Sequence, residues 1–196
     1  MMNSMNIYVK TSREVSKNQL DLIYEKIIKG PYVFAWDGMF GHLVLEEPRS
    51  QYVNLKLSFE AIISDLMEGI TTVIVPRFEK AISDLVKVCS RKGLYHFTQE
   101  LPRLLNENPL LCDRLLTFTD EVSEDVLDTI KNYLELNMSV NLVAKTMYTH
   151  RNTINYRISR FIELTGIDIR STTNGYYVYM LITWKNDLDC NKIIFE

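Results

Sequence analysis

Apolar residues follow two different spacings along the first third of the chain. The run NIYVK (residues 6–10) is typical of a short strand. A helix is predicted next, capped by Ser12 and ended by Gly30 and Pro31. Its apolar positions recur at helical spacing: Leu20, Ile23, Tyr24, Ile27 and Ile28.

Two apolar runs, PYVFAW and MFGHLVLE, flank the dipeptide Asp37-Gly38. This dipeptide favours the positive φ angles of a type I′ turn, so the two runs are expected to pair as an antiparallel hairpin. A second helix is predicted over residues 58–69, and the β-branched run at 70–75 predicts a strand that Pro76 ends. The order βαββαβ is that of a ferredoxin-like domain.

Strand signals stop after Pro76. An amphipathic helix is expected up to Gly93, followed by short helices that prolines interrupt, and then by helices only. The sequence therefore predicts an α+β fold followed by an all-α fold. The expected parts are a ferredoxin-like domain at residues 1–90, a helical connector at 91–120 and a helix-turn-helix domain at 121–196.

The expected all-α part contains two short helices joined by a tight turn. Ser123 starts the helix before them, with a hydroxyl cap and with acidic residues at the positive end of the helix dipole. Asn141 is the candidate cap of the next helix, and the last one runs from about His150 to Leu164. A short helix, a tight turn and a basic second helix describe a helix-turn-helix.

The segment AKTMYTHRNTINYRISRF (residues 144–161) contains no acidic residue, although the chain has a formal net charge of −3. On a helical wheel, Ile154, Ile158 and Phe161 form a buried stripe and polar residues occupy the other side. Arg, Asn, Thr and Tyr reach base edges or phosphate in the major groove, where a carboxylate would be repelled. The predicted DNA contacts are Thr149, His150, Arg151, Asn152, Thr153, Asn155, Tyr156 and Arg160.

Two residues of this segment have alternatives. His150 stands at a helix start, so it either caps the backbone or packs beside Tyr148, or else it contacts DNA. Arg157 lies beside the buried stripe, so it either contacts DNA or pairs with a carboxylate such as Glu163 or Asp168.

Residues 129–170 resemble the C-terminal helix-turn-helix of the PucR/CdaR family of bacterial transcription regulators. The stretch HRNTINYRI is close to that family's HRNT-plus-YRL signature, and ELTGIDIR fits its ELTG-x-DL segment. The motif is also similar to the Fis type of helix-turn-helix, in which the start of the second helix reads bases. The resemblance implies a DNA-binding regulator in which Arg151, Thr153 and Tyr156 contact DNA, with His150 and Asn152 beside them.

Members of this family often carry a degenerate GGDEF-like domain, itself ferredoxin-like, ahead of the motif. The hairpin AWDGMFGHLVL stands where a diguanylate cyclase would carry its GGDEF turn, but it lacks the Gly-Gly pair and the acidic pair. We therefore expect a degenerate GGDEF-like domain without cyclase activity. The sequence offers no nucleophile–base pair, phosphate-binding glycine loop or metal cluster, so we expect no enzyme, no catalytic residue, no cofactor and no metal.

Composition indicates whether the chain can form a core, bind zinc or enter a membrane. Hydrophobic residues make up 46% of the chain, which can build a proper core. The three cysteines, Cys89, Cys112 and Cys190, are widely spaced, so neither disulfides nor a zinc site are expected. No run approaches the ~18 apolar residues that span a bilayer, and a signal-peptide pattern is missing. We expect a cytoplasmic protein without membrane contact.

The partners follow from the charge pattern. An acidic chain with one basic helix argues against non-specific coating of DNA. One helix-turn-helix reads too few base pairs to find a site, so we expect a homodimer on a two-fold operator in double-stranded DNA. The dimer surface is left open between the N-terminal sheet and the tail CNKIIFE, added as an edge strand. A small-molecule effector is also left open. The alternative function is a non-enzymatic protein-interaction module with a degenerate helix-turn-helix.

Overall fold

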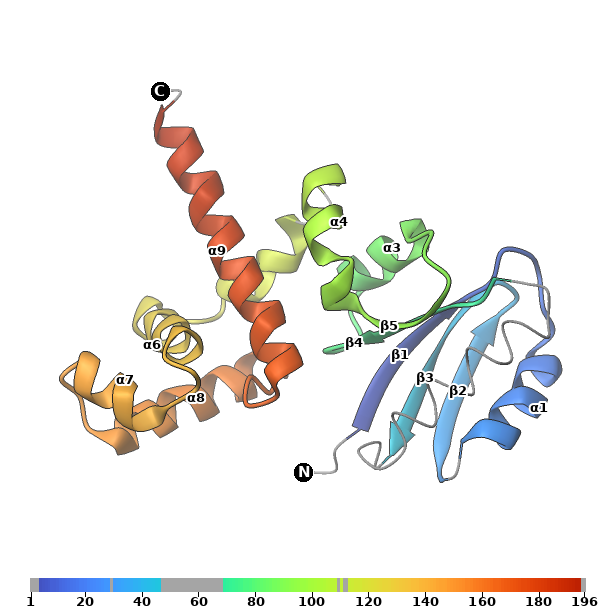
Figure 1. The fold of residues 1–196 in the computed structure, drawn as a ribbon, viewed down its shortest axis with the longest axis horizontal. Coiled ribbons are helices and arrows are strands. Elements are labelled where there is room, and N and C mark those ends of the chain that lie inside the picture. The colour runs from blue at the N-terminus through green and yellow to red at the C-terminus, as the bar shows by residue number, and fades with distance from the viewer. Residues whose placement is uncertain (1–3, 29, 47–68, 109, 111–112, 195–196) are drawn as a thin grey trace. The chain divides into compact units, whose positions relative to one another are not determined.

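The chain folds into a sheet-containing N-terminal unit followed by a helical C-terminal unit (Figure 1). The computed structural model describes residues 4–28, 30–46, 69–108, 110 and 113–194. The two compact units are Met1–Glu107 and Asn108–Glu196.

The described residues of the first unit form a five-stranded sheet with the strand order β2-β3-β1-β4-β5. Neighbouring strands are antiparallel from β2 to β4, whereas β5 is parallel to β4. Its elements are β1 (Ser4–Lys10), α1 (Lys17–Ile27), β2 (Tyr32–Asp37), β3 (Phe40–Glu46), β4 (Thr71–Val75), α3 (Lys80–Val88), β5 (Gly93–His96), η2 (Phe97–Gln99) and α4 (Leu101–Glu107). The helix predicted at residues 58–69 lies outside the described residues but for Gly69.

Strand β5 corrects the expectation that strands stop after Pro76. The Gly93 N–H donates to the Ile70 carbonyl at 2.9 Å, and the parallel register then pairs Thr71 with Gly93. Gly93 has φ +104°, a conformation that favours glycine. It begins a strand, whereas a helix end was expected at this residue. The first unit thus continues through residues that were assigned to the connector.

The hairpin of β2 and β3 is confirmed, but its turn lies one residue further along. Asp37 pairs with Phe40, which leaves Gly38 and Met39 as the loop. Of these two residues only Gly38 has a positive φ, at +61°, whereas a type I′ turn requires two. The type I′ expectation is therefore wrong.

Helix α1 covers one face of the sheet. Its buried side chains Leu20 and Tyr24 join a core with strand residues such as Ile7 and Phe34, and the Tyr24 and Phe34 rings meet edge-on at 4.9 Å. The cap of α1 is Ser16 and not Ser12. Its hydroxyl accepts from the Gln19 N–H at 3.4 Å, and the Gln19 side chain accepts from the Ser16 N–H at 3.3 Å. This reciprocal capping box satisfies two N–H groups, which a lone serine does not.

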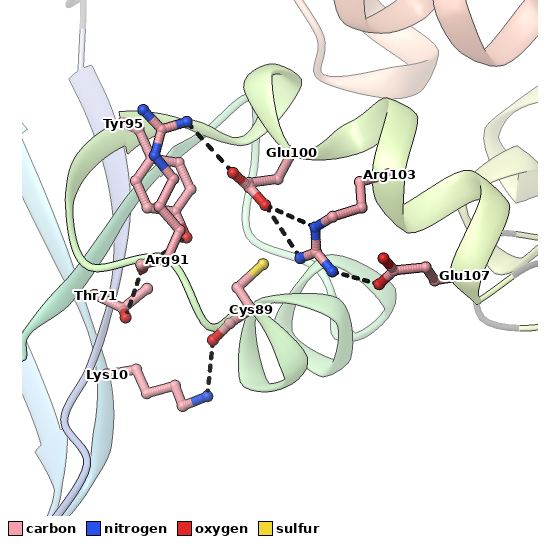
Figure 2. Close-up of polar contacts among 8 residues, drawn as sticks. All are labelled: Lys10, Thr71, Cys89, Arg91, Tyr95, Glu100, Arg103 and Glu107. Atoms are coloured by element: carbon pink, nitrogen blue, oxygen red, sulfur yellow. Dashed lines mark hydrogen bonds and ion pairs between the residues drawn. The ribbon is translucent and has the colours of Figure 1, made fainter.

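The segment after α3 is tied to the sheet through backbone carbonyls (Figure 2). Lys10, at the end of β1, donates to the carbonyls of Lys87 and Cys89, the latter at 3.0 Å. The Thr71 hydroxyl donates to the Arg91 carbonyl at 2.9 Å. These bonds hold the loop that leads into β5 against the start of β4.

Glu100 is the centre of a second set of contacts, also drawn in Figure 2. It is only 9% exposed, and it accepts from Arg91 at 3.3 Å and from the Arg103 Nε at 3.1 Å. The Arg91 guanidinium lies 4.8 Å from the centre of the Tyr95 ring, and Arg103 also pairs with Glu107. One carboxylate therefore joins the loop that leads into β5, through Arg91, to the helix α4 that ends the unit.

The second unit contains η3 (Arg114–Thr119), α6 (Glu124–Glu135), α7 (Val140–Thr146), α8 (Arg151–Thr165) and α9 (Thr172–Ile194). Helix α8 packs against both α6 and α7, and α9 packs against α6 and η3. The predicted stripe of α8 is confirmed, because Ile154, Ile158 and Phe161 are buried.

Three details of this unit differ from the predictions. Ser123 does precede α6, but its hydroxyl donates to the Asp125 carboxylate at 2.6 Å and makes no side-chain bond to the helix backbone. Helix α7 begins two residues early, because Ser139 accepts from the Leu142 N–H and Asn141 lies inside the helix. The tail is helical as far as Ile194, so it does not form an edge strand there.

Replacing Glu100 with Gln should lower the free energy of unfolding of the first unit by about 2 kcal/mol, because two arginines lose a nearly buried charged acceptor. Trp36 reports this unfolding by fluorescence in a Trp184→Phe background, since its Nε1 donates to the Val15 carbonyl at 2.7 Å. The matched control Glu107→Gln removes an exposed pair and should cost about 0.5 kcal/mol or less. Equal losses for both variants would contradict the central role of Glu100.

Candidate nucleic-acid interface

A tight turn connects α7 to α8. The Met147 N–H donates to the Val143 carbonyl at 2.8 Å, and the Thr149 N–H donates to the Ala144 carbonyl at 2.9 Å. Between them Tyr148 has φ +50°, in the left-handed region. This single left-handed residue ends α7 and redirects the chain into α8.

His150 is the N-cap of α8, so the capping alternative is confirmed, while its contact with DNA stays a prediction. Its Nδ1 accepts from the Asn152 N–H at 3.2 Å. Because Nδ1 accepts, a neutral imidazole carries its proton on Nε2. His150 is exposed, so this second nitrogen can still donate to a phosphate or base acceptor while the first one holds the cap.

The other predicted contacts lie at the surface. Thr149 is half-buried in the turn, and Tyr156 on α8 is 66% exposed. The remaining predicted contacts are all exposed: Arg151, Asn152, Thr153, Asn155 and Arg160. The wheel thus placed the buried and exposed sides of α8 correctly, whereas DNA contact itself stays a prediction.

The first turns of α7 and α8 enclose an open hollow of about 290 Å³. Arg151 and Asn155, one helical turn apart, line it from α8. Val140 and Asn141 of α7 line the other side, with the N-cap Ser139. Sequence reasoning missed these last three residues, because they lie at the start of the preceding helix and carry no basic charge. A hollow with hydroxyl, amide and guanidinium groups offers hydrogen bonds to a polyanion from two helices.

The side chain of Arg157 bonds to α6 and therefore does not belong to the exposed side of α8. Its Nη2 lies 2.8 Å from the Asp125 carboxylate, and its Nη1 donates to the Thr129 hydroxyl at 3.1 Å. Thr129 is fully buried, and its hydroxyl donates onward to the Asp125 carbonyl at 2.8 Å. The pairing alternative is therefore correct in kind, but the partner is neither Glu163 nor Asp168.

Those two carboxylates pair with other arginines. Glu163 lies 2.9 Å from Arg160, an exposed pair one turn apart, so Arg160 has to leave Glu163 before it can meet a phosphate. Asp168 pairs with Arg170 at 2.8 Å. The guanidinium of Arg170 lowers the pKa of the Asp168 carboxyl, and the Ser123 hydroxyl and then Arg157 lower the pKa of Asp125.

Other kinds of site find little support in the described residues. They contain no group of three or more His, Cys, Asp or Glu that could hold a metal ion. Among the same residues, every helix is too short or too polar to span a bilayer. In the first unit, burial raises the pKa of the Cys89 thiol, which therefore stays protonated at neutral pH.

The profile of the PucR C-terminal helix-turn-helix domain matches residues 126–183, the segment that contains α7, the turn and α8. These residues form a PucR helix-turn-helix domain. The match spans the whole predicted interface from Thr149 to Arg160.

Curated relatives match parts of this chain. The uncharacterized protein YxkF of Bacillus subtilis is 45% identical over 53 residues, which cover 27% of this chain and 18% of that protein. The proline-responsive transcriptional activator PutR of B. subtilis is 30% identical over 96 residues, or 46% and 23% of the two chains. The DNA-binding transcriptional activator AdeR of B. subtilis is 24% identical over 67 residues, or 34% and 16%. The matched segments span less than a quarter of each relative.

A solved structure aligns over more of the chain. A regulator of polyketide synthase expression from Bifidobacterium adolescentis covers 96% of this chain and 83% of its own, with 16% identity and a TM-score of 0.47.

Replacing Arg157 with Gln should destabilise the PucR domain by about 1–3 kcal/mol, because Asp125 and the buried Thr129 hydroxyl lose their charged partner. Trp184 fluorescence in a Trp36→Phe background follows unfolding of this unit in urea. Arg160→Gln is the matched control, since its exposed pair with Glu163 should contribute about 0.5 kcal/mol or less. A larger loss for Arg160→Gln would contradict the structural role of Arg157.

The lowered pKa values of Asp125 and Asp168 predict a pH dependence of stability. A carboxyl whose pKa is lower in the folded state stabilises the fold above its unfolded pKa of about 3.9, and this contribution is lost as the pH falls below that value. The melting temperature of the second unit should therefore fall below about pH 4. The double variant Asp125→Asn, Asp168→Asn should show a shallower fall between pH 5 and pH 2, and an unchanged profile would disprove this assignment.

Proposed function

We propose that this protein is a sequence-specific DNA-binding transcriptional regulator of the PucR/CdaR type, acting on DNA in the bacterial cytoplasm. The observation that carries the proposal is the exposed side of α8 within the PucR domain. It presents basic, amide and hydroxyl groups over three turns and has no carboxylate before Glu163. Such a surface suits a polyanion and offers donors and acceptors to base edges.

The residues divide by role along α8. Arg151, in the first turn, is the proposed base-reading residue, because the start of the second helix enters the major groove in helix-turn-helix docking. Asn152, Thr153, Asn155 and Tyr156 follow within two turns and supply further donors, acceptors and an apolar surface. Three others are proposed to contact the phosphate backbone: Thr149, His150 and Arg160.

The proposed assembly is a homodimer on a two-fold operator whose half-sites lie roughly 34 Å apart or a multiple of that. The tail is helical up to Ile194, so we assign the dimer surface to the first unit. In its sheet, β2 and β5 are the outer strands in the described order, and outer strands can pair with a second chain.

The first unit is proposed to be a degenerate GGDEF-like domain with a ferredoxin-like fold. The antiparallel order β2-β3-β1-β4, with α1 between β1 and β2, supports this architecture. In sequence, the turn Gly38-Met39 is flanked by one carboxylate, Asp37, and it has no Gly-Gly pair. We therefore propose no cyclase activity, and detection of cyclic dinucleotide formation from GTP and magnesium would disprove this.

We propose that a small-molecule effector, if this protein has one, binds in a cavity of the first unit. A cavity beside α1 has a volume of about 480 Å³, which is within the size range of small-molecule sites. Its lining includes the apolar side chains Leu20, Ile23 and Ile70 and the polar or charged side chains Arg13, Glu14 and Gln19.

The alternative function is a protein-interaction module with a degenerate helix-turn-helix, which the net charge of −3 favours. A salt titration of binding to mixed-sequence DNA separates the two functions. A regulator should lose affinity steeply as salt rises, because bound phosphates release counterions. An interaction module should show no DNA binding at any salt concentration.

Replacing Arg151 with Ala should cost about 1–3 kcal/mol on the preferred site and much less on random DNA, because a base contact is lost. The site is first found by selecting bound fragments from random DNA, and the affinities are then measured by fluorescence anisotropy. The matched variant Arg160→Ala should weaken both DNAs alike and flatten the salt slope by roughly one ion. Equal weakening of both DNAs by Arg151→Ala would show that Arg151 does not read a base.

A further inference from the structure

The turn of the PucR domain carries an aromatic side chain that the fold does not use. Tyr148 is 97% exposed, and its side chain makes no hydrogen bond or ring contact with the part of the chain that the structure describes. Only its backbone is engaged, through an N–H that donates to the Lys145 carbonyl at 3.3 Å. A large apolar ring left in water contributes nothing to folding.

The backbone at Tyr148 makes this placement costly. Its φ of +50° lies in the left-handed region, which costs a residue with a Cβ roughly 1–2 kcal/mol and which glycine adopts freely. Tyrosine at this position is therefore unfavourable for the fold both in its backbone and in its side chain. Such strain at a surface turn indicates a role outside the fold.

Another left-handed residue of the same unit shows how the fold can offset this strain. Met138, in the turn between α6 and α7, has φ +59°. Its terminal methyl lies against Gly175 of α9, where a Cβ built on the glycine would be only 2.7 Å away. Packing thus retains Met138 in its conformation, whereas Tyr148 has no comparable contact in the described residues.

The position of Tyr148 indicates what it touches. It precedes Thr149 and the N-cap His150, so it stands at the end of α8 that is proposed to enter the major groove. The chain carries no acidic residue from 141 to 162, so a phosphate can approach the turn without meeting a carboxylate nearby in the sequence. A tyrosine offers an O–H donor to a phosphate oxygen and a flat apolar ring to a sugar.

We propose that Tyr148 contacts the DNA backbone beside the reading helix, its hydroxyl donating to a phosphate oxygen and its ring lying on the adjoining deoxyribose. This inference rests on the proposed DNA-binding function. A tyrosine is not a cation, so its contact strengthens binding without counterion release and without sequence preference.

The test compares variants of the full chain on the selected site and on random DNA. Tyr148→Gly removes the ring and the strain, so its melting temperature should not fall, while its affinity should drop about tenfold on both DNAs, which corresponds to about 1.4 kcal/mol. The salt slope should stay as in the wild type. Tyr148→Asn, which tolerates the left-handed region, should weaken binding to the same degree and so excludes loop flexibility as the cause. Tyr148→Phe should lose about threefold, by the loss of one hydrogen bond.

Two control variants test whether the effects are specific to Tyr148. Tyr176→Ala removes a half-exposed tyrosine on α9 and should leave DNA affinity unchanged. Met138→Gly should lower the melting temperature, because its packing against Gly175 is lost.

The outcomes separate this inference from the function on which it rests. If the wild type bound no DNA, the proposed function would fail. Wild-type DNA binding with equal affinity of Tyr148→Gly would overturn the role of Tyr148 alone, and would leave a protein partner as the occupant of this surface. A loss confined to the selected site would show a base contact, and full affinity of Tyr148→Phe would remove the phosphate bond; either result overturns the proposal as stated.

Discussion

The arrangement of the second unit depends on which side chains of α8 are buried and which are exposed. Ile154, Ile158 and Phe161 are buried against α6 and α7, which fixes the rotation of the helix about its own axis. Arg157 refines that rotation, because its guanidinium bonds to Asp125 and to the buried Thr129 hydroxyl. A helix that reads a groove must hold its side chains in register with base edges, and burial on one side provides that rigidity.

Periodicity predicted most of this arrangement. The stripe on α8 was correct because a 3.6-residue repeat determines which side chains share a face, whatever the tertiary context. The partner of Arg157 could not be predicted, because Asp125 lies 32 positions earlier and the contact depends on the packing of α6 on α8. The residues of α7 that share a hollow with Arg151 were missed for the same reason.

In the first unit, the hairpin was predicted correctly, although its turn type and the cap of α1 were not, whereas the distant pairing of β5 was missed. Alternation and turn residues predicted the hairpin of β2 and β3, since its contacts are close in sequence. Strand β5 escaped detection because Gly93–His96 is too short for a period, and its pairing with β4 is parallel and crosses over through α3. The network around Glu100, which fastens the same segment, joins charged residues whose partners only tertiary structure selects.

Because β5 pairs with β4, a fragment of the first unit should include β5. A fragment that stopped at residue 90 would expose the side of β4 that β5 now pairs, a row of unused backbone donors and acceptors. Strand β4 consists of five buried residues, Thr71–Val75, without a charge, so the bare strand would invite aggregation. During synthesis the same strand stays unprotected until residues 93–96 have left the ribosome, which makes this interval the vulnerable one for the newly made chain.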